Sequence, residues 1–172
     1  EVCGHVFDYD ADTIVEKELD KVDEAFPFKT SKRVSWINID GLRKADIDLI
    51  SAYFGIHALL IEDILSVSQR PKMDEVEGVM LCLLNMLYYN EAKQTVEVEQ
   101  LSIVLGDQFV ISFQEDASRD VFNPLRERLR LPTSKARGRS ADYLCYAMLD
   151  MIVDSYFLVM DKLGDRIELL EE

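Results

Sequence analysis

The sequence predicts an α/β fold in which a mixed parallel and antiparallel sheet is sandwiched between helices, followed by the start of a long helix. Three strand-like segments follow one another over 78–113 with short connections, as in an antiparallel meander. Helix-like segments flank this meander on both sides, so helices are expected to cover the sheet. We therefore expect an α/β domain over 1–137 and the beginning of a long helix over 138–172.

The first forty residues are expected to contain two strands and a helix. Val2–Phe7 is short and rich in β-forming residues, which indicates a strand. The mixed acidic stretch Asp10–Glu24 is interpreted as a helix. Val34–Ile39 combines β-branched and aromatic residues and is followed by the turn signal Asp40-Gly41, so it is expected to be a buried strand.

Two short helices are expected next. Lys44–Phe54 places its apolar residues at helical spacing, and Gly55 follows where a left-handed residue closes many helices. His57–Leu65 is predicted to be a second helix, with His57 as a capping residue at its start.

The meander itself is predicted from three apolar segments. Gly78–Tyr89 is almost continuously apolar, whereas Val96–Leu105 alternates in the manner of a strand with two different faces. Residues 90–93 supply a hairpin turn between them, and Gly106-Asp107 supplies another before the strand Phe109–Phe113.

The last part of the chain is expected to be helical. Val121–Arg130 is a basic helix, and a loop leads from it to Ser140, which suits the N-cap of a long helix. Asp142 lies in the first turn of that helix, where the helix dipole favours an anion. Because no glycine or proline cap follows 164–172, we expect the helix to continue beyond Glu172.

The composition narrows the range of partners. The formal net charge is -14, so phosphate backbones and anionic lipids are repelled, and cations or basic proteins are the expected partners. The basic residues between Arg126 and Arg139 are expected to pair with the acids of the protein itself or of a neighbouring subunit.

The three cysteines, Cys3, Cys82 and Cys145, are interpreted as reduced core residues of an intracellular protein. The longest apolar segment, 79–89, is too short to span a membrane, so the chain as given is expected to be soluble.

The predicted terminal helix carries an acidic stripe, a row of Asp and Glu residues along one face. At 3.6 residues per turn, its carboxylates gather on one narrow face, while Ile152, Val159, Leu163 and Leu170 face the opposite way. The stripe is either a solvated surface or a face that binds a divalent cation or a basic chain. If it binds a cation, carboxylate ligands without His or Cys favour Mg²⁺ or Ca²⁺. Its members are Asp150, Asp154, Asp161, Asp165, Glu168 and Glu172.

A second acidic pair, Glu62-Asp63, lies on the predicted short helix. Adjacent carboxylates on a helix are usually only solvated, but the apolar neighbours Leu60, Ile61, Ile64 and Leu65 would anchor this helix and position its charged tip. An enzyme is not expected, because the sequence has no glycine-rich phosphate loop, no G-x-S-x-G motif and no C-x-x-C motif, and neither histidine has an obvious catalytic partner.

Several motifs in order resemble the N-terminal cytoplasmic domain of the CorA family of magnesium and cobalt transporters. The first group is Trp36-Ile37-Asn38-Ile39-Asp40-Gly41, Phe54-Gly55-Ile56-His57, Leu60–Leu65 and Gln69-Arg70-Pro71-Lys72. The match continues with Phe113-Gln114-Glu115, Arg126-Glu127-Arg128 and Ala141-Asp142-Tyr143-Leu144, leading to Asp150, Asp154 and Tyr156.

This resemblance implies a homopentameric, channel-like transporter of divalent cations, Mg²⁺ or Co²⁺, whose cytoplasmic domain senses intracellular Mg²⁺. The implied metal ligand of one site between neighbouring subunits is Asp63, with Glu62 beside it, and Asp150 is implied to contribute to a nearby site. Asp154, which lies one turn further along the acidic stripe, is expected to be a ligand as well. The domain would lie at the cytoplasmic face of the inner membrane and reach the membrane only through helices beyond Glu172. Two alternatives stay open: the same domain of a zinc-transporting relative, or a soluble acidic adaptor that binds a basic partner.

Overall fold

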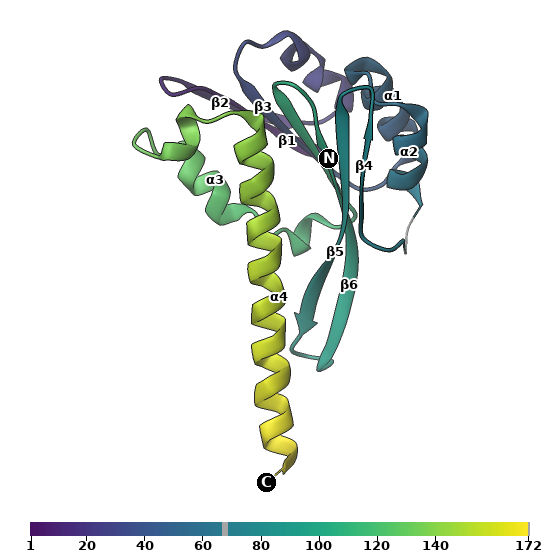
Figure 1. Cartoon of the computed structure of the whole chain (residues 1–172), viewed down its shortest axis with the longest axis vertical. Helices are drawn as coiled ribbons and strands as arrows, with labels where there is room; N and C mark the ends of the chain where they lie inside the picture. The colour runs from purple at the N-terminus through teal and green to yellow at the C-terminus, as the bar shows by residue number, and fades with distance from the viewer. Residues whose placement is uncertain (67–68, 172) are drawn as a thin grey trace.

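The computed structural model describes residues 1–66 and 69–171 (Figure 1). Its centre is a seven-stranded sheet with the order β2-β1-β3-β7-β6-β5-β4. The pairing of β3 with β7 is parallel, and the other strand pairs described are antiparallel, so the predicted mixed sheet is confirmed. The strands are β1 (Gly4–Tyr9), β2 (Ile14–Leu19), β3 (Val34–Asp40), β4 (Lys72–Val76), β5 (Val79–Asn90), β6 (Thr95–Leu105) and β7 (Phe109–Gln114).

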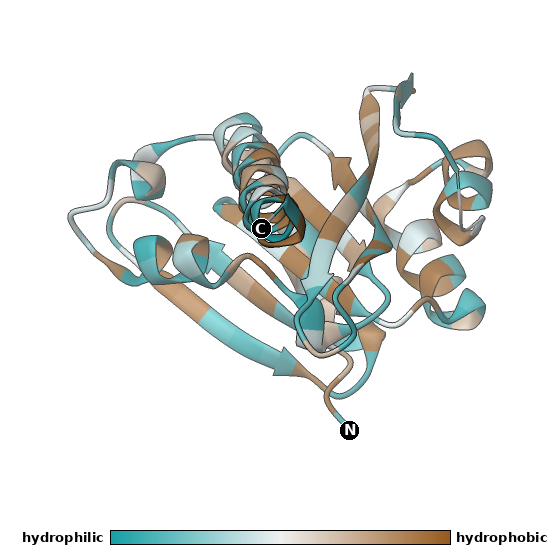
Figure 2. Ribbon diagram, turned by 90° about the horizontal axis from the view of Figure 1, so that it is seen from below, coloured by the Kyte–Doolittle hydropathy of each residue, from teal (hydrophilic) through white to brown (hydrophobic). Residues whose placement is uncertain are grey.

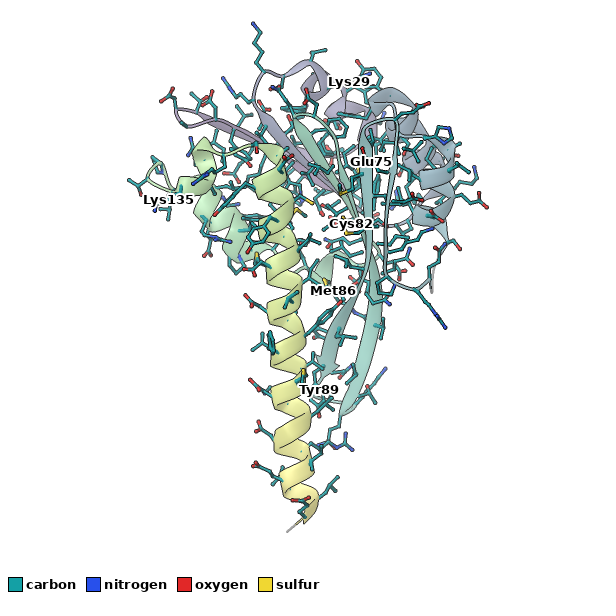
Figure 3. All side chains as sticks on the ribbon, in the orientation of Figure 1. Lys29, Glu75, Cys82, Met86, Tyr89 and Lys135 are labelled. Atoms are coloured by element: carbon teal, nitrogen blue, oxygen red, sulfur yellow. The ribbon has the colours of Figure 1, made fainter. Side chains whose placement is uncertain are left out.

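Helices cover both faces of this sheet (Figure 2). Successive residues of a strand point to opposite faces, and the core is accordingly divided in two: Ile37 and Ile111 belong to one apolar cluster, and Trp36 and Val110 to the other. The first cluster contains α1 (Lys44–Phe54) and α2 (Ala58–Leu65), and the second contains α3 (Asn123–Arg130) and α4 (Ala141–Glu171). Figure 3 shows Cys82 and Met86 of β5 on the α4 side.

Most of the predicted elements are confirmed, including the helix over 44–54, the meander and the long final helix. Gly55 closes α1 with φ of 73°, which is the left-handed conformation expected there. The cysteines are buried free thiols. The expected pairing of the basic residues within the chain is also present, since Arg126 contacts Asp120 at 2.6 Å and Arg130 contacts Glu16 at 2.8 Å.

The helix predicted over Asp10–Glu24 is wrong. The segment forms β2, which pairs antiparallel with β1, and then enters a 3-10 helix, η1 (Val22–Thr30). The turn between β1 and β2 is fixed by Asp10, whose Oδ1 accepts the backbone N–H groups of Asp12 at 2.9 Å and Thr13 at 2.7 Å. This local side-chain turn reverses the chain at the point where a helix would have had to begin.

The strand β4 was not predicted. It is an edge strand whose residues are mostly exposed, so its sequence lacks the apolar alternation that identifies a half-buried strand. It joins β5 through Glu77 and Gly78, which have φ of 54° and 79°. The two left-handed residues make a tight hairpin, and β4 exists because this hairpin lays it against β5.

The long helix α4 begins after Ser140 and packs on the sheet through its N-terminal half. Ile152 and Val159 are buried, as predicted, but Leu163 is 38% exposed and Leu170 is 77% exposed. The tip of the β5–β6 hairpin contacts α4 at Lys162, which lies 2.8 Å from Glu91, and at Arg166, which donates to the Gln94 carbonyl. Leu163 lies between these two contacts and is partly covered, whereas Leu170 lies beyond them. Figure 1 shows the free end of α4 beyond this hairpin.

One described helix, α4, is long and apolar enough to cross a membrane by length and composition alone, with a mean hydropathy of 1.4 over an 18-residue stretch. Core helices of globular domains can be equally long and apolar. The side chains of Leu144, Met148 and Ile152 account for part of this apolar character, because they lie in the cluster between α4 and the sheet.

Buried polar side chains join the two parallel strands. The Trp36 indole N–H donates to Ser112 Oγ at 3.0 Å, and Ser112 Oγ donates to Asn38 Oδ1 at 2.7 Å. Asp40 Oδ1 then accepts from Asn38 Nδ2 at 3.0 Å and from Gln114 Nε2 at 2.7 Å. This chain of hydrogen bonds crosses repeatedly between β3 and β7 and fixes their register.

Replacing Phe122 by alanine should lower the free energy of unfolding by about 3–5 kcal/mol. Phe122 is fully buried, and its ring meets the Trp36 ring edge-on with centroids 5.7 Å apart, so its removal leaves a cavity between α3 and the sheet. Urea unfolding followed by circular dichroism measures the loss. Leu131→Ala is the control, because Leu131 is exposed and its truncation should change stability by only about 0.5 kcal/mol. Equal losses in the two variants would contradict this packing.

Replacing Glu99 by glutamine should change how stability depends on pH. Burial raises the pKa of Glu99 above its ordinary value of 4.5, although its Oε1 accepts the backbone N–H of Asp116 at 2.6 Å. Because the folded state holds this proton more tightly than the unfolded chain, the contribution of Glu99 to the stability of the wild type falls as pH rises above about 4.5. Glu99→Gln has no such proton to lose.

The free energy of unfolding of Glu99→Gln, measured relative to wild type by urea titration at a series of pH values, should therefore increase from pH 4 to neutral pH. A flat difference for Glu99→Gln would show that the buried carboxyl does not titrate abnormally.

Candidate functional site

Helix α2 holds the first pair of predicted ligands, Glu62 and Asp63. The helix begins at His57, whose Nδ1 accepts the backbone N–H of Leu59 at 3.1 Å, so the predicted capping role is confirmed. Leu60 and Ile64 are fully buried and fasten the helix to the sheet. The acidic end of α2 is therefore anchored by buried side chains, as the sequence suggested.

Asp63 has a partner that the sequence reasoning missed. Its Oδ2 lies 2.7 Å from the Nζ of Lys72, the first residue of β4. The Asp63 side chain is 19% exposed and that of Lys72 is 40% exposed, while Glu62 is an exposed residue. Lys72 was visible in the Gln69–Lys72 motif, but the pairing could not be found without the unpredicted strand β4.

The Lys72 ammonium is surrounded by negative charge. Its hydrogen bond to Asp63 is the largest cause that raises the pKa of Lys72, and the neighbouring charges of Asp74 and Glu62 raise the pKa further. A positive charge is thus already held where the carboxylates of α2 and β4 converge.

The second pair of predicted ligands, Asp150 and Asp154, lies on the exposed side of α4. Both residues line an open groove of about 700 Å³ between α3 and α4. Glu127 and Arg128 bring further charge to this groove from α3. Its apolar floor and walls come from Val121, Leu131, Met151 and Leu158.

The rest of the acidic stripe is exposed as predicted. Asp161, Asp165 and Glu168 are exposed along α4, whereas Glu172 lies outside the described residues. Lys162 and Arg166, which are the cations of this helix segment, contact the β5–β6 hairpin instead of the stripe. The carboxylates of the stripe therefore remain exposed to solvent, with like charges spaced one turn apart on the helix.

The two predicted pairs do not meet within one chain. Glu62 and Asp63 lie on α2, which packs on one face of the sheet, and Asp150 and Asp154 lie on α4, which packs on the other (Figure 2). Within residues 1–66 and 69–171, no group of three or more His, Cys, Asp or Glu side chains is arranged to hold a metal ion. Each pair offers carboxylate oxygens as candidate ligands.

Oxygen ligands of this kind suit a hard cation. Mg²⁺ keeps several of its waters and is usually held by only one or two carboxylates, so a pair of carboxylates suits it chemically. Zinc prefers nitrogen and sulfur ligands, and neither pair has such a ligand among the groove or ion-pair residues described above.

Known proteins resemble this chain over most of its length. A family described as CorA-like Mg²⁺ transporter protein matches residues 31–172. Among curated proteins, the chain is 39% identical over 168 residues to the cobalt/magnesium transport protein CorA of Thermotoga maritima, covering 97% of this chain and 48% of the relative. It is 29% identical over 137 residues to the putative metal ion transporter YfjQ of Bacillus subtilis, covering 80% of this chain and 41% of the relative.

Solved structures share the fold. The soluble domain of CorA from Methanocaldococcus jannaschii matches with a TM-score of 0.71 and 20% identity, covering 97% of this chain and 62% of that one. The cytoplasmic domain of ZntB from Vibrio parahaemolyticus matches with a TM-score of 0.61 and 15% identity, covering 96% and 63%.

At these identities the structural matches show the fold alone, so the second of them does not favour zinc. The chain spans about half the length of the Thermotoga maritima relative. The family match over 31–172, the 39% identity and the shared fold show that this chain belongs to the CorA-like Mg²⁺ transporter family.

Proposed function

We propose that this chain is the cytoplasmic regulatory domain of a divalent-cation transporter of the Mg²⁺/Co²⁺ type, and that Mg²⁺ is its regulatory ligand. The observation that carries the proposal is the placement of two half-sites of carboxylates on opposite faces of one sheet. Family membership supports the transporter and argues against the acidic adaptor, while the half-sites support the regulation.

The location of the two half-sites on opposite faces of the sheet limits how copies of the chain can share an ion. If the α2 tip of one copy meets the α4 groove of the next, the contact joins two different surfaces, and repeating such a contact builds a closed ring when the rotation allows it. A homopentamer at the cytoplasmic face of the inner membrane is the ring we propose. Contact with the membrane is assigned to other parts of the full-length protein, with 1–137 as the α/β cytoplasmic domain and 138–172 as the start of the connecting helix.

The residues that would hold the ion are Asp63 and Glu62 from one copy and Asp150 and Asp154 from its neighbour. The net charge of -14 makes two such faces repel each other in the absence of a counter-ion. Bound Mg²⁺ supplies the charge that cancels this repulsion. The carboxylates then favour the closed arrangement of subunits when the ion is abundant, and their repulsion favours a looser arrangement when it is scarce.

Mg²⁺ should therefore promote self-association of the chain at millimolar concentration, beyond the effect of NaCl at matched ionic strength. Asp63→Asn and Asp150→Asn should each weaken the Mg²⁺-dependent association by about tenfold, as expected for the loss of one charge-assisted contact of about 1.4 kcal/mol. Sedimentation velocity at several protein concentrations measures both effects.

Asp23→Asn is the matched control, because Asp23 is an exposed carboxylate on η1, away from both half-sites. It should associate as the wild type does. An equal response to NaCl and Mg²⁺ would reduce the effect to ionic screening, and an unchanged response in both half-site variants would contradict the assignment of these carboxylates.

A further inference from the structure

The ion pair between Asp63 and Lys72 bears on the strength of the proposed site. We propose that Lys72 is a built-in competitor for the divalent cation at Asp63, so that the Lys72 ammonium must leave before the ion can bind this carboxylate. The inference rests on the proposed function and adds to it a residue that sets the concentration at which the site fills.

The contact places a cation on the carboxylate. Lys72 Nζ lies 2.7 Å from Asp63 Oδ2, which is direct hydrogen-bond distance. A divalent ion at the same oxygen would lie within a few ångströms of this ammonium, and two cations at that separation repel each other. The ammonium and the ion therefore exclude each other at this oxygen.

The pairing of β4 with β5 places the Lys72 side chain on the same face of the sheet as α2. In the antiparallel pair of β4 with β5, Lys72 lies opposite Leu83 and Asp74 lies opposite Leu81. Leu81 and Leu83 belong to the apolar cluster of the α2 face, and directly opposed residues of a sheet share a face. Lys72 and Asp74 thus project toward the same side as the acidic tip of α2.

The surroundings of Lys72 resemble those of a bound cation. Asp63 accepts its hydrogen bond, and Asp74 and Glu62 are close enough to act on its charge. The ammonium is the positive charge that these carboxylates currently share. Its removal would leave three negative charges to attract a divalent ion.

Release of the ammonium is energetically easy. The Lys72 side chain is 40% exposed and flexible, so its ammonium can move into solvent while the buried anchors of α2 keep Asp63 in place. Partly exposed ion pairs contribute little to stability, which means that an ion of higher charge can displace this one. If the ion pair were only structural, removal of Lys72 would lower the free energy of unfolding and leave the affinity for Mg²⁺ unchanged.

The test is a Mg²⁺ titration of the 172-residue chain followed by the NMR shift of the Asp63 carboxyl carbon, which reports the occupancy of this site alone. In Lys72→Met, the apparent Kd for Mg²⁺ at Asp63 should fall about three- to tenfold relative to wild type, because the competing charge is gone and most of the side-chain stem remains. In Lys72→Arg, which keeps the charge, the Kd should stay within about twofold of wild type.

Lys44→Met is the matched control, because it removes a lysine that pairs with Asp48 on α1 and should leave the Kd at Asp63 unchanged. Equal Kd values in wild type and Lys72→Met would overturn the competitor role while leaving Mg²⁺ binding at Asp63 intact. A carboxyl signal that does not respond to Mg²⁺ in any variant would overturn the proposed regulatory site itself, and the role of Lys72 with it.

Discussion

The hydrogen bonds between the parallel strands β3 and β7 hold the two halves of the sheet together. Beyond β3 lies the hairpin of β1 and β2, and beyond β7 lie β6 and β5 with β4 at the edge. The chain of polar side chains from Trp36 through Ser112 and Asn38 fixes the register of the pair in the dry interior. A one-residue slip would exchange the two faces of β3 and bury the wrong side chains.

That register decides where the charged groups lie. It separates the apolar cluster of α1 and α2 from that of α3 and α4, and so places Asp63 and Asp150 on opposite faces. A single chain does not bring these carboxylates to one ion, and in the proposed ring they would come from neighbouring copies. The proposed regulation by Mg²⁺ rests on this separation, whereas the proposed competition by Lys72 rests on its ion pair with Asp63.

The sequence predicted those elements whose burial is periodic. The helix over 44–54, with Gly55 after it, and the apolar strands of the meander have one face or both faces in the core. The edge strands β2 and β4 are mostly exposed and have no such pattern, so one was assigned to a helix and the other was missed. The acidic residues could be identified as candidates, but the partner of Asp63 depends on β4, and the exposure of Leu170 depends on where the hairpin ends.

The central claim is that the α2 face of one copy meets the α4 face of another, and a distance between spin labels tests it most directly. One preparation carries a label at Leu59→Cys on α2 and another at Val153→Cys on α4, both exposed positions, while the native cysteines are buried. The two preparations are mixed in Mg²⁺ and measured by double electron-electron resonance. A defined distance between a label on α2 and a label on α4 should appear, shorter than the distance between two labels on the same helix of different copies. NaCl at matched ionic strength, without Mg²⁺, should abolish this distance. A shorter distance between like labels would show a two-fold contact of identical faces and would contradict the account.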